Sequence, residues 1–378
     1  MRMWMAWGLA ALLMAPSPGY GAKTVWQEEG SNLSIFGDMR FRYETDHHEA
    51  DGKPSEDRVR QQIRFRIGAG YKANETVSIG ARMASAADDD HSTNHYLGIL
   101  GGGTAESTFG LDQAYIKLDF KPGWFWVGKN ENPSWDATQL TWDPDIQPEG
   151  AAIGVKTGDS VKAWAFAGYY ILNATYYRAK DDTMTAYQAG VSFGEGFGIK
   201  AAVGGYSMHD KSDTGEGALA VPGGTASYNH AMLELNGKSL PLSPVLGAQY
   251  TTSSVNKEKY IGAGAKDSDR QATAVYLGFK PGPVTVTLTM WDVGYAGATA
   301  LGALVGDEFA TVSNYTGWDI KVGGVLFGAL EAAARYEFQQ VKNDSIKPTG
   351  GPSGSQGSAQ LGKGDKRSRI RFDFSVKF

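Results

Sequence analysis

The chain has 378 residues, 50 of them glycine, with no cysteine and a formal net charge of −5. This length allows two ordinary domains or one large β architecture, and the lack of cysteine excludes a disulfide framework and thiol chemistry. The acidic balance does not favour nucleic acid as a partner, and the mean hydropathy of −0.33 is too low for a helical membrane protein.

The N-terminus has the features of a cleaved secretory signal, predicted for residues 1–22. Arg2 supplies a positive charge, "WMAWGLAALLM" is a short apolar core, and "APSPGYGA" adds helix breakers and small residues for cleavage after Gly21 or Ala22. The alternative, a membrane anchor, needs a longer apolar core and a stop-transfer pattern. We therefore predict that residues 1–22 are removed and that residues 23–378 are exported as a single domain.

After the signal, apolar and polar side chains alternate in segment after segment. The stretch "DRVRQQIRFRIGAGYK" (57–72) places arginines on one face and Val, Ile and Phe on the other. A period of two is typical of an extended strand with two opposed faces. About sixteen strands are predicted, at 33–44, 57–71, 76–85, 109–120, 124–130, 150–156, 161–172, 184–193, 197–208, 228–235, 243–253, 270–279, 284–295, 315–326, 329–341 and 367–378.

The breaks between these strands alternate between short and long. Short ones include "KANE", "KPG", "TGDS" and "GEG", whereas the long ones are polar and rich in Gly and Asp. The long breaks are predicted near 45–57, 86–108, 131–149, 173–183, 209–227, 254–269, 296–314 and 342–366. This rhythm is typical of an up-and-down meander with one elaborated end.

Two features favour a membrane barrel over a soluble sandwich or propeller. Aromatic residues of the apolar face lie beside the short turns, where an interfacial girdle belongs: Tyr71, Phe120, Phe193 and Phe279. The chain also ends in the amphipathic strand "RIRFDFSVKF", which can pair with the first strand and remove both sheet edges. The predicted fold is all-β: a transmembrane antiparallel up-and-down β-barrel of about sixteen strands, with short periplasmic turns and long extracellular loops.

The signal, the sixteen-strand rhythm and the C-terminal aromatic strand resemble Gram-negative outer-membrane porins. Residues 140–156, "LTWDPDIQPEGAAIGVK", resemble a loop-to-strand passage of a proteobacterial putative-porin family, in which a Trp/Phe-Asp-x-Asp-x-x-Pro-Glu-Gly run precedes a strand. The resemblance implies a diffusion channel without a cofactor, usually a homotrimer, surrounded by outer-membrane lipid and lipopolysaccharide. It also implies that the barrel-assembly machinery recognises the C-terminal strand, with Phe374, Val376 and Phe378 as the signal.

Basic residues gather on strands that barrel closure makes neighbours. They are Arg40, Arg42, Arg60, Arg64, Arg66, Arg82, Arg369 and Arg371. An arginine facing lipid at the midplane costs roughly 2–4 kcal/mol, but one facing a wet lumen costs little, so we predict that they line the pore. They either solvate the wall, balanced by Asp38, Glu44 and Asp373, or form a basic stripe that biases ion passage. Because fewer acids than arginines were found, the stripe is favoured.

The third long loop, 131–149, carries five acids together with Trp and Pro residues that favour a compact shape. The acids are Glu131, Asp136, Asp143, Asp145 and Glu149. The resemblance implies that this loop folds into the barrel and narrows it. Its acids, facing wall arginines, would then set a transverse field across a constriction. The alternative is an ordinary surface loop.

The stretch "ADDDHSTNH" (87–95) contains acids and two histidines, His91 and His95, at a spacing that metal ligands use. It lacks the Gly and the final Glu of an EF-hand loop, so a solvated acidic loop is favoured and no metal site is predicted. A divalent cation bridging this loop to lipopolysaccharide phosphates remains an open alternative.

Catalysis has little support in the sequence. The histidines fall mainly in predicted loops, and only His230 lies in a predicted strand, where its neighbours Ser227 and Asn229 have no triad spacing. The predicted function is therefore a non-enzymatic outer-membrane channel for passive diffusion of ions and small hydrophilic solutes. A substrate-selective channel on the same fold, and an outer-membrane enzyme or adhesin, are the alternatives.

Overall fold

The computed structural model describes residues 24–26, 32–49, 55–86, 93–97, 108–173, 181–209, 225–255, 266–294, 314–342 and 364–378. The predicted signal peptide, residues 1–22, lies outside these ranges. Among the described residues, no helix has the length and apolar character needed to cross a membrane.

Eighteen strands in the described ranges form one sheet. Two of them are short: β1 (Thr24–Trp26) and β5 (His95–Tyr96). The other sixteen form the barrel wall: β2 (Leu33–Glu49), β3 (Glu56–Lys72), β4 (Val77–Ala86), β6 (Thr108–Phe120), β7 (Gly123–Lys129), β8 (Glu149–Thr157), β9 (Val161–Asn173), β10 (Asp182–Phe193), β11 (Gly198–His209), β12 (Thr225–Asn236), β13 (Val245–Ser253), β14 (Gln271–Phe279), β15 (Val284–Val293), β16 (Tyr315–Leu326), β17 (Leu330–Val341) and β18 (Lys366–Lys377). Each overlaps one predicted strand, so the sixteen-stranded prediction is confirmed.

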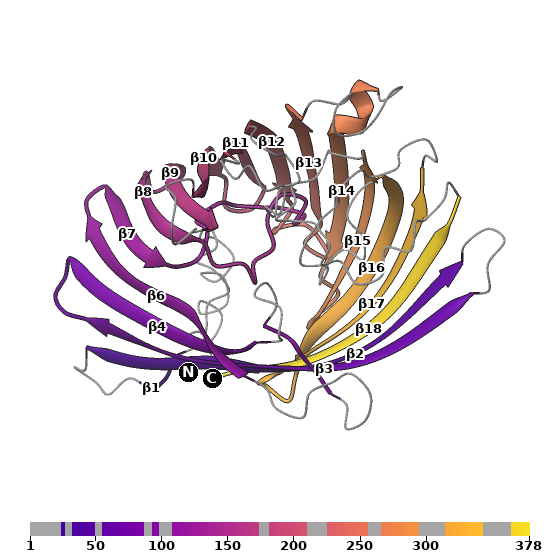
Figure 1. The fold of residues 1–378 in the computed structure, drawn as a ribbon, viewed down its shortest axis with the longest axis horizontal. Coiled ribbons are helices and arrows are strands. Elements are labelled where there is room, and N and C mark those ends of the chain that lie inside the picture. The colour runs from indigo at the N-terminus through magenta and orange to yellow at the C-terminus, as the bar shows by residue number, and fades with distance from the viewer. Residues whose placement is uncertain are drawn as a thin grey trace.

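The last strand closes the sheet on the first long strand. β18 pairs antiparallel with β2 from Lys366 opposite Glu49 to Lys377 opposite Asp38, and Figure 1 shows the yellow β18 beside the indigo β2. Beyond the strand, the Phe378 amide donates to the Gly37 carbonyl at 3.0 Å, and the Gly37 amide donates back at 2.7 Å. A closed barrel leaves no unpaired edge, which the bilayer core requires.

The outer face of the wall is apolar and the inner face is polar, which is the reverse of a soluble protein. Val59 and Val203 are 60% and 62% exposed, and the outward side chains of β18 from Ile370 to Val376 are also exposed. Charged side chains such as Arg42 and Arg371 are only 1% and 2% exposed, because they point inside. An apolar exterior with a polar interior is stable when the exterior meets lipid.

Some strand ends differ from the predicted ones. The predicted loop 45–57 is shorter than expected, because β2 continues to Glu49 and β3 begins at Glu56, with His47 opposite Asp57. His47 and His48 therefore lie in a strand, His95 lies in β5 and His209 ends β11, so the prediction that only His230 lies in a strand was wrong. Strand ends above the lipid band meet water on both faces, so the apolar alternation stops before the hydrogen-bonded ladder does.

Candidate functional site

The segment between β7 and β8, residues 130–148, lies inside the barrel. Its backbone bonds to strands far around the ring: the Trp135 amide donates to Gln188 of β10 at 2.9 Å, and the Thr138 amide donates to Gln249 of β13 at 3.0 Å. Figure 1 shows this magenta trace crossing the interior beneath β10 to β13. We call residues 130–148 the internal loop.

One acid of the internal loop folds the loop itself. The Asp136 carboxylate accepts hydrogen bonds from four backbone amides, of Thr138, Gln139, Thr141 and Trp142, at 2.8–3.2 Å. A short acidic side chain often bonds neighbouring backbone amides in this way and stabilises an irregular turn. Among the described residues no ion pair joins Asp136 to an arginine, so the prediction that it faces the wall arginines was wrong.

Asp143 lines a cavity together with the wall arginines, whereas Glu149 lies outside the loop in which it was predicted. The Asp143 carboxylate accepts from the Asp145 amide at 2.7 Å, and its carbonyl accepts from the Ile146 amide at 3.0 Å, which forms a tight turn. Glu149 is the first residue of β8 and pairs with Lys129 of β7 at 2.9 Å, opposite it in the register. Its placement in the loop was therefore wrong, because the strand begins one residue earlier than predicted.

Asp145 holds the internal loop to the arginine wall. Its carboxylate lies 3.0 Å from Arg64, 3.3 Å from Arg66 and 3.8 Å from Arg40. Burial alone would raise the pKa of Asp145, but the three guanidinium groups outweigh burial and hold this pKa well below its usual range. The loop carboxylate therefore stays ionised, and it neutralises part of the arginine charge.

Glu131, at the start of the internal loop, is in a different setting. Its carboxylate lies 3.8 Å from Arg82, but the Arg82 guanidinium bonds Asp112 more closely, at 2.5 Å. Burial therefore dominates and raises the pKa of Glu131. The pKa values of the two loop acids that reach wall arginines are thus shifted in opposite directions, down for Asp145 and up for Glu131.

The internal loop packs its aromatic side against one half of the wall. Trp142 stacks on Tyr206 of β11 with ring centroids 5.6 Å apart. Trp142 belongs to a buried cluster with Trp126, Phe166, Tyr170, Met184 and other apolar residues of β7 to β12. Offset stacking of large rings adds to the area they bury. This side of the lumen is therefore filled, and the open space lies on the other side.

Each of the eight predicted arginines pairs with a carboxylate, seven with one on the inner wall and Arg40 with Asp145 of the internal loop. The pairs are Arg42–Asp373, Arg60–Glu44, Arg64–Asp38, Arg66–Asp38, Arg82–Asp112, Arg369–Glu337, Arg371–Glu44 and the longer Arg40–Asp145. Most of these partners sit opposite or diagonally across neighbouring strands, where cross-strand side chains meet. Arg42 and Asp373, for example, share the same register position of β2 and β18 and make two bonds of 2.6 and 3.2 Å.

The acidic partners are more numerous than the sequence indicated. With three further arginines, eleven in all pair with nine carboxylates. The carboxylates are Asp38, Glu44, Asp46, Asp112, Glu131, Asp145, Asp319, Glu337 and Asp373. The inner wall from β16 to β6 and the internal loop therefore form a ladder of ion pairs in which arginines outnumber these acidic partners, as the sequence indicated, but by less than the eight arginines and three acids first recognised on the wall.

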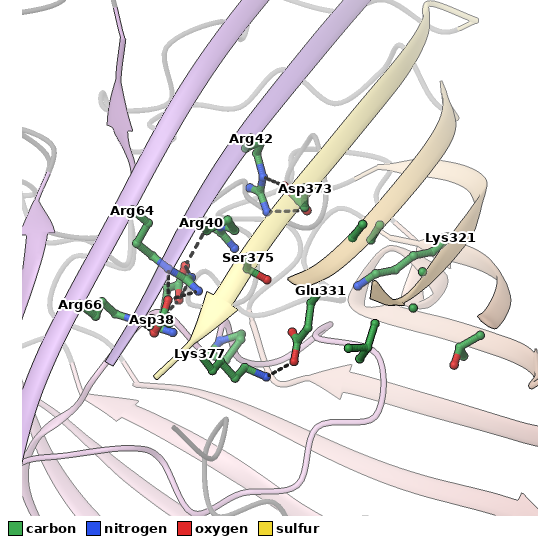
Figure 2. A pocket seen from close by; sticks show the side chains of 18 of the residues that line it. Asp38, Arg40, Arg42, Arg64, Arg66, Lys321, Glu331, Asp373, Ser375 and Lys377 are labelled. Carbon is green, nitrogen blue, oxygen red and sulfur yellow. Dashed lines mark hydrogen bonds and ion pairs between the residues drawn. The ribbon is translucent and has the colours of Figure 1, made fainter. Parts of the chain in front are cut away.

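A cavity of about 280 Å³ lies between this wall and the internal loop. Residues 143–145 of the loop and the arginines of β2 and β3 line one part of it. Strands β15 to β18 line the rest, with Thr285, Lys321, Glu331 and Lys377 (Figure 2). It is bounded by charged and hydroxyl groups and by small residues.

Comparison with known proteins agrees with this geometry. Residues 52–210 match the model of a family described as "Putative porin". The predicted resemblance to this family is confirmed. The match contains the internal loop and its anchors Arg64, Arg66 and Tyr206, but not the closing strand.

Solved structures show the porin fold at low sequence identity. OmpF of Salmonella typhi, solved in complex with daunomycin, is 10% identical, with 93% of this chain and 100% of that chain covered and a TM-score of 0.56. OprB of Pseudomonas putida, in a high-pH structure, is 11% identical, with 91% and 94% covered and a TM-score of 0.55. No curated protein matches the chain. The family match and the fold agree with the predicted porin-type barrel.

The candidate catalytic and metal residues do not form a site in the described ranges. His230 points inward on β12, with its Nε2 atom 3.2 Å from Gln188, whereas Ser227 and Asn229 have the opposite parity and face outward. His91 falls in residues 87–92, outside the described ranges. In the parts of the chain that are described, no three potential metal ligands come together.

Sequence reasoning missed several polar residues of the lumen. Glu337 and Arg335 belong to the polar face of a strand that was correctly predicted, but neither was assigned to the pore. Lys321 of β16 was missed in the same way, although it lines the cavity. Their parity alone was a sufficient signal that they face the lumen. Their partners depend on the register, which the sequence did not provide.

Proposed function

We propose that the protein is an outer-membrane channel for passive diffusion of ions and small hydrophilic solutes. The observation that carries this proposal is the polar cavity beside the internal loop, enclosed by a closed barrel with an apolar exterior. An apolar outer band anchors such a barrel in lipid, and a polar lumen lets hydrated solutes pass.

In this proposal the internal loop is the constriction. Its aromatic side is buried against β7 to β12. On its other side, Asp145 forms ion pairs with the arginines of β3. A solute then passes between residues 143–145 and the wall of β15 to β18. The arginines proposed as pore-lining hold the loop and the wall in shape through their ion pairs.

Assembly is also part of the proposal. The C-terminal strand carries Phe374, Val376 and Phe378 on its outer face, and the Phe378 backbone pairs with Gly37 to complete the ring. We propose that this strand is recognised by the barrel-assembly machinery after export and cleavage of residues 1–22. Lipid and lipopolysaccharide then surround the barrel, and three copies associate through their walls.

Planar-bilayer recording of the purified, folded protein tests this function. Stable open steps that scale with salt concentration are expected, with heat-modifiable migration on gels as the measure of folding. Small steps that a particular solute blocks would point to a substrate-selective channel instead. Folded protein that inserts in the bilayer and gives no conductance overturns the proposal and favours an enzyme or adhesin.

A further inference from the structure

Three of the four arginines that line the cavity are poorly placed to act on a passing ion. Arg42, Arg64 and Arg66 are 1%, 8% and 5% exposed. Each has a carboxylate oxygen within about 3 Å: Asp373 for Arg42, and Asp38 for the other two. A buried pair of opposite charges presents a dipole and not a net charge, so its field falls off quickly with distance.

The opposite part of the cavity contains an exposed cation in a different setting. Lys321 of β16 lines the cavity and is exposed, and Figure 2 shows it extending from its strand into the space beside Glu331. Among the residues that the structure describes, no carboxylate oxygen lies within 4.0 Å of its ammonium.

The carboxylates around Lys321 are already paired with other cations. Asp319, on the same face of β16, lies 2.8 Å from Arg335, which is opposite Lys321 in the register. Glu331 lies 3.0 Å from Lys377. The lysine therefore adds a net positive charge to an exposed wall whose other charges are largely balanced.

The surroundings also leave space for a hydrated ion. Gly323 and Ala333 are cross-strand partners on the cavity wall beside Lys321, and they place no bulky side chain there. Thr285 and Ser375 add hydroxyl groups to the lining. A lysine ammonium is a compact, hydrated point charge on a flexible stem, which suits brief contacts with small anions more than tight binding.

We propose that Lys321 is the residue that determines ion selectivity, as a docking point for small monovalent anions on the β15 to β18 wall. This inference rests on the proposed channel function and assigns its selectivity to a residue outside the arginine ladder. Chloride and acetate are the probe anions. Because the ammonium is exposed, the wall is expected to tolerate its replacement.

The test measures reversal potentials across a gradient of KCl, and then of potassium acetate, for Lys321→Gln, Lys321→Glu and Lys321→Arg. Coulomb's law in water gives about a threefold change in local anion concentration for one charge at roughly 6 Å. The same charge lowers the local cation concentration by the same factor, so the anion-to-cation permeability ratio should fall by up to about tenfold in Lys321→Gln at 0.1 M salt, and further in Lys321→Glu. It should stay at the wild-type value in Lys321→Arg, and the differences should shrink at 1 M salt.

The matched control is Lys117→Gln. Lys117 has the inward parity of β6 but lies 2.7 Å from Asp119 and outside the cavity lining, so its removal should leave the ratio nearly unchanged. Conducting Lys321 variants with a wild-type ratio, or an equal shift in Lys117→Gln, overturn this inference and leave the channel function standing. A folded wild-type protein without conductance overturns both.

Discussion

Replacing Asp145 with asparagine tests how the internal loop is held in the barrel. The substitution keeps the size of the side chain but removes the charge that lies 3.0 Å from Arg64, 3.3 Å from Arg66 and 3.8 Å from Arg40. The loop keeps its contacts on the other side of the lumen, including the Trp142 stack on Tyr206. Only the turn around residues 143–147 should therefore loosen.

The free-energy cost of the substitution depends on how deeply the ion pairs are buried and on which carboxylates the arginines keep. The side chains of Asp145, Arg64 and Arg66 are 8%, 10% and 6% exposed, and removing one partner of a buried ion pair costs about 3–5 kcal/mol. Both arginines keep Asp38, at 3.0 and 2.6 Å, so the lower end, about 3 kcal/mol, applies. At 1.4 kcal/mol per factor of ten, the detached turn becomes roughly a hundredfold more populated.

In Asp145→Asn, single-channel recording at pH 7 should show the detached turn as excess open-channel noise and more frequent brief closures. Asp145→Glu, which keeps the charge, should stay close to the wild type. The pKa of Asp145 is lowered in the folded state, so its stabilising effect is complete above the unfolded value near 3.9 and is lost only as the pH falls through the lowered value. The asparagine variant should therefore differ from the wild type throughout pH 4 to 7.

An Asp145→Asn channel with wild-type open-channel noise, closure frequency and conductance at pH 7 would refute this reasoning. It would mean that the aromatic side of the internal loop holds the turn without the ion pairs. Heat-modifiable migration of the same sample provides the necessary check that the barrel itself is folded.

Three further predictions concern other parts of the molecule. Glu131→Gln should leave thermal stability unchanged or slightly higher at pH 7, because the pKa of Glu131 is raised by burial and its ionised form is disfavoured above that value; clear destabilisation would show that its contact with Arg82 dominates. Val203→Arg puts a charge on the lipid face and should cost about 2–4 kcal/mol in unfolding titrations in lipid, and an unchanged midpoint would mean that the faces are reversed. Deletion of Phe378 should lower surface levels, since it removes the pairing with Gly37 that completes the barrel; normal levels in an outer-membrane fraction would contradict this.

The sequence by itself determined the wall of this barrel. Alternation is a local property of an extended chain, so "IRFRIGAGYK" predicts a two-faced strand whatever pairs with it. The same reasoning located all sixteen long strands, and the amphipathic terminal strand indicated closure against the first. The alternation also separated the lumen-facing arginines from the lipid-facing Val, Ile and Phe, because the bilayer makes the wrong face costly.

Only the tertiary structure decided which charges meet. Whether Arg42 faces Asp373, or Arg369 faces Glu337, depends on the register between strands that can be more than 300 residues apart. Five acids in one loop looked equivalent in the sequence, yet Asp136 bonds the loop backbone, Glu149 belongs to β8 and Asp145 pairs with the wall arginine Arg64. An irregular loop has no period from which side-chain direction can be predicted, so its direction follows from the barrel interior that surrounds it. Lys321 gained its significance for the same reason: it is distinguished from the arginines by the pairing of its neighbours and not by its own residue type.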